Sequence, residues 1–134
     1  MFLMSAWEVS VLLHQGAKKG VEIVIEIAVK AFLSDALPVP VLMEFPENPP
    51  EAFVVLHKGD SGRENHLDTA MFVADSYGGS LYDCAALNEQ VKAEFDRLTE
   101  LDCVSCVAPA GDYPAFDTKN KRHRYQAVYN LSHY

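Results

Sequence analysis

Cys103 and Cys106 have the spacing of a redox CxxC pair, and no other residues of this sequence suggest chemistry so directly. A reactive pair of this kind needs its first thiolate at a helix N-terminus, which lowers the thiol pKa. Here the pair follows a predicted helix and leads into residues 107–111, where no helix begins. Strand side chains point alternately to opposite faces, and a zinc site would need two further ligands. We therefore interpret both cysteines as small, buried, hydrophobe-like residues, with a small thiol- or metal-dependent enzyme as the alternative.

Glu64, His66 and Asp68 form a second arrangement, because they alternate along the chain. On an extended segment they would point to one side, and two carboxylates around an imidazole suit acid–base or metal chemistry. The sequence offers no second cluster to converge on them, and no phosphate-binding glycine loop, nucleophile elbow or Ser/His/Asp set. We interpret the three residues as a solvated loop entering a strand. We predict no catalytic residue, no cofactor and no metal site, and therefore no enzyme.

Near the C-terminus the sequence carries a basic patch, formed by Lys119, Lys121, Arg122 and Arg124. One interpretation is a solvated loop tip. The other is a surface complementary to the acidic helix of a neighbouring copy, a head-to-tail contact of the kind that closes rings. The separation of positive and negative charge between two segments of one chain keeps the second interpretation open.

Two short apolar runs, 39–44 and 52–58, are joined by a proline-rich connection that contains Pro46, Glu47, Pro49 and Pro50. Neither run can continue as a strand through these prolines, so we expect a hairpin with a stiff turn. A rigid turn loses little conformational entropy when a subunit contact orders it. We therefore predict that these four residues form an interface element or a plain hairpin turn.

The chain as a whole is acidic, with 11 Lys and Arg against 19 Asp and Glu in 134 residues and a formal net charge of −8. This balance argues against sequence-specific nucleic-acid binding, which needs clustered cations. Three cysteines are too few for a disulfide scaffold and indicate a reduced cytosolic compartment. No apolar run approaches the roughly 20 residues that span a bilayer, so no membrane association is expected. We predict one domain over 21–134, preceded by a segment 1–20 that is a short helix or an N-terminal extension.

Two main helices are expected to position these residues. The first covers 21–37, where the apolar residues also fit a strand but Glu26 and Lys30 lie on one helical face. The second covers 80–101 and begins with a capping box at Ser80 and Asp83. Its apolar residues recur at steps of three and four as a single stripe, namely Cys84, Leu87, Val91, Phe95 and Leu98.

The remaining segments are predicted to be strands and loops. Strands are expected at 39–44, 52–58, 67–77, 103–108 and 122–134, and longer loops at 59–65 and 109–121. The order is then α-β-β-β-α-β-β. This order predicts an α+β fold, with a mostly antiparallel sheet of about five strands and both main helices packed on one face.

Taken together, these segments resemble the tail-terminator (tail-completion, or tail-to-head joining) proteins of long-tailed bacteriophages. The likeness runs from Val21 to the end of the chain and includes "VEIVIEIAVKAFLSDAL", "VPVLMEFPENPPEAFVVLHKGDSG", "TAMFVADSYGGSLYDCAALNEQVKAEF" and "DTKNKRHRYQAVYNLS". None of these segments is a catalytic signature. The segment 1–20 departs from the family pattern.

The resemblance implies a small α+β subunit that assembles as a ring, commonly of six, on the last ring of the tail tube, from monomers in solution. Its partners would be other copies of itself, the major tail tube protein and the head connector or neck protein. It would end tube growth and provide the surface for head joining. Made in the bacterial host cytoplasm, it would reside at the head–tail junction of the virion. Besides the thiol or metal enzyme, a monomeric adaptor protein is the remaining alternative.

Overall fold

A computed structural model of the chain describes residues 25–134. The expected helix or extension at 1–20, and the expected start of the first main helix at Val21, lie outside the described residues. In chain order the described elements are α2 (Ile25–Ala36), β1 (Val41–Leu42), β2 (Phe53–Glu64), β3 (Leu67–Tyr77), α3 (Leu81–Phe95), the 3-10 helix η1 (Leu98–Glu100), β4 (Val104–Pro114) and β5 (Arg124–His133).

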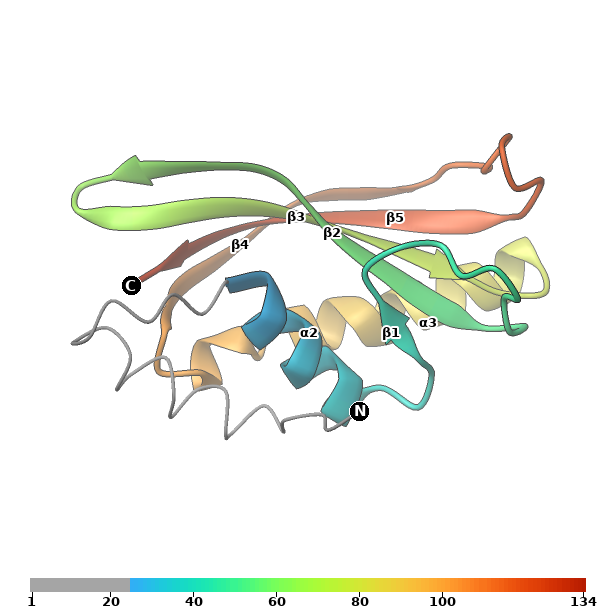
Figure 1. Ribbon diagram of the computed structural model, residues 1–134, viewed down its shortest axis with the longest axis horizontal. Coiled ribbons are helices and arrows are strands. Elements are labelled where there is room, and N and C mark those ends of the chain that lie inside the picture. The colour runs from blue at the N-terminus through green and yellow to red at the C-terminus, as the bar shows by residue number, and fades with distance from the viewer. Residues whose placement is uncertain (1–24) are drawn as a thin grey trace.

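The five strands form one sheet in the order β1-β2-β3-β5-β4, and α2 and α3 lie together on one side of it (Figure 1). The three pairings among β2, β3, β5 and β4 are antiparallel, whereas β1 pairs with β2 in parallel. The predicted α+β class, the order of elements and the mostly antiparallel sheet are therefore confirmed. No helix in the described part of the chain is long and apolar enough to cross a membrane.

The main core lies between the sheet and the two helices. The second helix ends at Phe95, earlier than the predicted 101, and Leu98 lies in η1. Every residue of its predicted apolar stripe is nevertheless buried, namely Cys84, Leu87, Val91, Phe95 and Leu98. The predicted cap is also present, because the Ser80 hydroxyl accepts the backbone N–H of Asp83 at 3.1 Å. Across the core, the ring of Phe95 stacks on Tyr129 of β5 at a centroid distance of 4.5 Å. These contacts fix α3 against the middle of the sheet.

The prediction that the runs 39–44 and 52–58 form a hairpin is wrong. β1 has only two residues, and they pair in parallel with Val54 and Val55 of β2. Parallel neighbours cannot be joined by a tight turn, so residues 43–52 form a longer return loop between them. Pro40 has no N–H to donate, but its carbonyl accepts the N–H of Val54 at 2.9 Å and so begins the pairing.

The two long loops expected at 59–65 and 109–121 are also mostly wrong. β2 continues to Glu64 and β4 continues to Pro114, because Gly59 and Gly111 lie at β-bulges and Gly62 pairs regularly with Thr69. The register shifts between Lys58 and Asp60, and again between Pro109 and Gly111. What remains of the first loop is a two-residue turn at 65–66, where both residues have positive φ angles, 52° and 66°.

Because β2 and β4 are longer than predicted, the sheet ends in a hairpin on one side and in a connecting segment on the other (Figure 1). At one end, residues 59–68 of β2, β3 and their turn form a hairpin that we call the arm. At the other end, residues 115–123 connect β4 to β5 and form a segment that we call the tip. β3 runs from the arm to the tip end, since Leu67 pairs with Glu64 in the arm and Tyr77 pairs with Arg124 beside the tip.

Candidate functional site

The return loop and the tip, the two segments predicted from sequence as interface elements, meet at the same end of the sheet. Arg122 joins them, because its guanidinium donates to the carbonyl oxygens of Pro50 at 3.1 Å and Glu51 at 2.8 Å. The same guanidinium lies over the ring of Phe53, 5.2 Å from its centroid. Two segments some 70 positions apart in the sequence are thereby held as one surface.

An aromatic cluster holds the return loop against the sheet face that α2 and α3 leave uncovered. Phe45 of the loop contacts Phe53 and Tyr77 edge-on, at centroid distances of 5.5 and 5.3 Å. Phe53 and Tyr77 in turn stack on each other at 4.7 Å. Both strand residues are almost completely buried. The loop is therefore fixed by packing as well as by its prolines.

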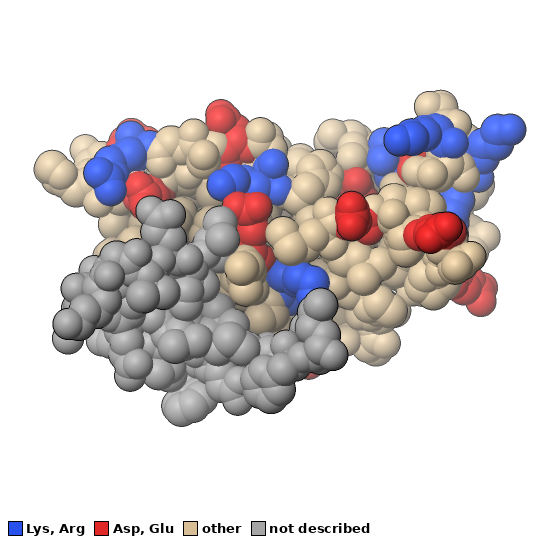
Figure 2. Space-filling model, in the orientation of Figure 1, with Lys and Arg blue, Asp and Glu red and all other residues tan. Residues whose placement is uncertain are grey.

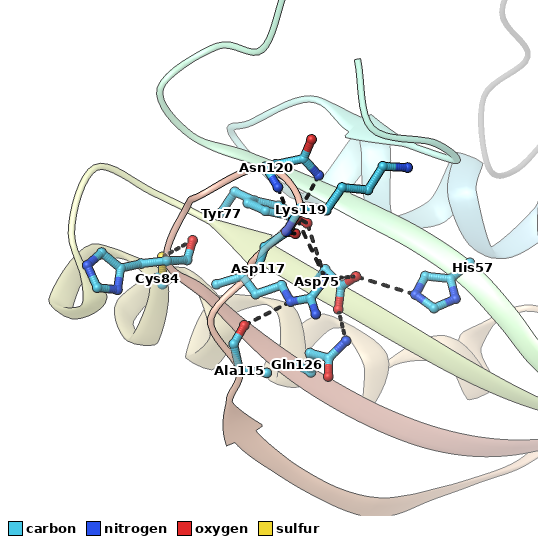
Figure 3. A network of polar contacts seen from close by, with 11 residues as sticks. His57, Asp75, Tyr77, Cys84, Ala115, Asp117, Lys119, Asn120 and Gln126 are labelled. Carbon is cyan, nitrogen blue, oxygen red and sulfur yellow. Dashed lines mark hydrogen bonds and ion pairs between the residues drawn. The ribbon is translucent and has the colours of Figure 1, made fainter. Parts of the chain in front are cut away.

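Asp117 organises the tip from inside. One carboxylate oxygen accepts the backbone N–H groups of Lys119 and Asn120, both at 3.1 Å. The other accepts the Asn120 side-chain amide at 2.7 Å and the Tyr77 hydroxyl at 2.8 Å. The backbones of Asp117 and Arg122 also exchange two hydrogen bonds, of 2.9 and 3.2 Å. The tip is thus a closed turn around a buried carboxylate (Figure 3).

These contacts set the charge states of the site. Burial alone would raise the pKa of Asp117, but the hydrogen bonds from Asn120 and Tyr77 and the charge of Arg124 outweigh it and lower the pKa to about 2. Burial, followed by the hydrogen bond to Asp117, raises the pKa of Tyr77 to about 12. At neutral pH the pair is therefore a carboxylate and a neutral phenol that donates to it.

Arg124 lies beneath the tip, and a second buried carboxylate accompanies it. Its guanidinium is 3.7 Å from Asp75 and 3.9 Å from Asp117. Asp75 also accepts the side-chain amide of Gln126 at 2.7 Å and lies 3.4 Å from Nε2 of His57 (Figure 3). The charged groups of this network face one another, so each is compensated inside the protein.

The predicted interface residues accordingly divide into two groups. Glu47, Pro49, Pro50, Lys119 and Lys121 are exposed and Pro46 is half-buried, so these side chains form the outer surface of the site. Arg122 and Arg124 are half-buried and connect the loops to the sheet. The structure thus brings together all eight positions, with two different roles among them.

Four carboxylates on and beside α3 are already engaged in ion pairs within the chain, two with Lys92 and two with Arg97. Lys92 lies 3.1 Å from both Glu89 and Asp112. Arg97 lies 2.9 Å from Glu94 and 2.8 Å from Glu100. These carboxylates are therefore less suited to bind the basic patch of a neighbouring copy than the sequence suggested.

The two cysteines of the CxxC pair differ in environment. Cys103 is buried, as predicted, and burial raises the pKa of its thiol. Cys106 is exposed, so the expectation that both are buried is wrong for this residue. The register shift between Val104 and Cys106 changes the alternation of the strand at this point. Neither cysteine lies at a helix N-terminus, since both flank the start of β4.

Glu64, His66 and Asp68 do not share one side of an extended segment. The turn at 65–66 separates them, so that Glu64 ends β2, His66 lies in the turn and Asp68 belongs to β3. Asp68 pairs with Arg63 across the hairpin at 3.1 Å. Among residues 25–134, no group of three or more His, Cys, Asp or Glu side chains is placed to hold a metal ion.

Models of known protein families give no match to this chain, and a search of curated proteins finds none either. The site must therefore be interpreted from its own geometry.

Sequence reasoning missed the residues that support this surface. The sequence predicts a loop at Asp117 and a strand at Tyr77 and Asp75, and it indicates no special role for any of the three. A local signal existed for the first of them, because an Asp in a turn often accepts the backbone N–H two residues on, as Asp117 does from Lys119. No local signal existed for the other two, since their partners come from distant positions in the chain.

Proposed function

We propose that this chain is a structural subunit that assembles as a ring on the end of a phage tail tube, stops tube growth and offers a joining surface to the head connector. The observation that carries the proposal is the preformed surface at the tip end of the sheet, where the return loop and the tip are locked together by Arg122. A surface that is ordered beforehand loses little conformational freedom on assembly. The proposal that this assembly is a ring on a tail tube comes from the resemblance to tail terminators.

The environment of the reactive side chains supports a structural role over an enzymatic one. Cys103 lies in the main core. Asp75 and Asp117 share the charge of Arg124, and each also accepts side-chain hydrogen bonds. Groups held in this way stabilise the fold, whereas a general base must be able to reach a substrate proton.

Capping is tested by adding the purified chain to tail tube protein that is polymerising in solution. We expect tube lengths, measured by electron microscopy, to stop increasing once enough chains are present to form one ring at each tube end. The ring should be visible at that end. Tubes that keep growing at any chain concentration, together with a chain that stays monomeric beside them, would refute the proposal and favour the adaptor.

The double variant Cys103→Ala/Cys106→Ala separates the proposed function from the thiol enzyme. We expect it to cap tubes as the wild type does, because the proposed assembly uses no thiol chemistry and both substitutions are small. Loss of the biological activity in a variant that keeps the wild-type circular dichroism spectrum would favour the enzyme instead.

A further inference from the structure

The arm borders a hollow of about 440 Å³ on the sheet face away from α2 and α3. Four strands contribute to it, with Asp60 and Glu64 from β2, Met71 from β3, Cys106 from β4 and Asn130 from β5 among its lining residues. Met71 pairs with Asn130, and the neighbouring pair, Phe72 with Tyr129, belongs to the core. Since side chains alternate along strands, Met71 and Asn130 point away from the helices.

The hollow is acidic. Asp60 and Glu64 both line it, and neither has an ion pair within the described residues 25–134. The single arginine of the arm, Arg63, is already paired with Asp68 at 3.1 Å. The volume lies within the roughly 300–1,000 Å³ of pockets that enclose small ligands, so it has room for more than one side chain.

The tip has the complementary chemistry. Lys119 and Lys121 are exposed and form no ion pair within the part of the chain that the structure describes. Phe116, next to them, is 52% exposed, and its ring contacts His123 edge-on at 5.3 Å. Basic side chains gather at this end of the molecule in Figure 2. Aromatic side chains are enriched at protein interfaces, and the lysines beside this one supply charge that can complement an acidic partner.

The tip cannot reach the hollow of its own chain. The hollow reaches along β3 as far as Met71, six residues before Tyr77 at the tip end, which is a separation of about 20 Å along the strand. The tip is also closed by the bonds of Asp117, so it cannot extend over that distance. Complementary surfaces at opposite ends of one rigid chain are satisfied by a head-to-tail contact between copies.

We propose that the tip of one copy docks in the hollow of the next, with Phe116 against Met71 and with Lys119 and Lys121 beside Asp60 and Glu64. This inference rests on the proposed ring function and names the contact that builds the ring. In this proposal the basic patch binds the acidic hollow of the neighbouring copy, and not the acidic helix α3 that the sequence suggested. Because each copy carries one tip and one hollow, the contact repeats around a closed ring.

Charge reversal on either side tests the contact. The tip variant Lys119→Glu/Lys121→Glu and the hollow variant Asp60→Lys/Glu64→Lys should each lower the self-association constant about tenfold or more at low salt. The constant is measured by sedimentation equilibrium at protein concentrations high enough for wild-type chains to associate. An equal mixture of the two variants should restore it, because every contact in an alternating ring then pairs opposite charges. If neither variant alone differs from wild type, or if the mixture associates no better than its components, the proposal is overturned.

Cys106 allows a positional test, because it is an exposed thiol that lines the hollow. With Lys119→Cys, a mild oxidant should produce a ladder of disulfide-linked oligomers that disappears when Cys106→Ser is added. The matched control is Ser34→Cys, an exposed position on α2, which should give no ladder that depends on Cys106. A ladder of equal strength from the control, or none from Lys119→Cys, contradicts the docking.

The two proposals fail separately. If wild-type chains form the Cys106-dependent ladder but do not cap tail tubes, the docking stands and the ring has another role. If both charge-reversal variants cap tubes as the wild type does, the capping function stands and the docking is wrong.

Discussion

Replacing Asp117 with Asn should loosen the tip and lower the free energy of unfolding at neutral pH. The substitution keeps the size of the side chain but removes its charge. It also turns one oxygen, which accepts from Tyr77 and from the Asn120 amide, into an NH₂ group that has to face two donors. The tip would then lose the bonds that close it, while the strands below stay intact.

The magnitude follows from the pKa of Asp117. Its fall from 3.8 to about 2 corresponds to about 2 kcal/mol of stability. The carboxylate lies just beneath the surface, so solvent screening reduces this to about 1–2 kcal/mol. Because the folded-state pKa lies below the unfolded value, the contribution is fully present above about pH 4. It is lost as the pH falls through the folded pKa of about 2.

Urea unfolding of wild type and Asp117→Asn, at pH 7 and near pH 2, measures this contribution. We expect the variant to be less stable by about 1–2 kcal/mol at pH 7, with a smaller difference near pH 2, where the wild-type carboxylate is itself becoming protonated. The matched control is Asp68→Asn, a half-exposed carboxylate paired with Arg63, which should cost less than about 1 kcal/mol. An equal loss at both pH values would refute this account of the tip.

Three further outcomes are expected. Ser80→Ala should lower the free energy of unfolding by about 1 kcal/mol in urea titrations, because the N–H of Asp83 loses its cap; an unchanged midpoint would contradict this. Arg122→Lys should make the loop 43–52 more sensitive to protease while the circular dichroism spectrum stays constant, since a lysine cannot bridge two carbonyls in this way. A maleimide should label one thiol rapidly in native protein, that of Cys106, and label Cys103 only after unfolding, because burial raises the pKa of Cys103 and blocks access to it.

The elements predicted correctly are those that local periodicity specifies. The strand 67–77 was predicted with the bounds that β3 has, and the stripe of α3 is buried as expected. In both, alternation or a helical repeat runs unbroken through the element. Ser80 could also be identified, because a capping box requires only two residues at fixed spacing.

The elements predicted wrongly are those in which glycine or proline has a tertiary role. Gly59 and Gly111 signal loops in the sequence, yet both lie at bulges inside long strands. Whether a glycine ends a strand or kinks it depends on the neighbouring strand, which the local sequence does not specify. The same holds for Asp75, whose arginine partner is about fifty positions away.

The parallel pairing of β1 determines where the candidate surface lies. In a hairpin, the prolines would occupy a turn beyond the ends of two paired strands, with few contacts to the rest of the protein. Parallel pairing instead requires the chain to return beside its own start, so the loop crosses the end of the sheet and buries Phe45 on Phe53 and Tyr77. Tyr77 is also the residue that donates to Asp117. The loop and the tip therefore share one anchor, and disrupting Tyr77 should release both together.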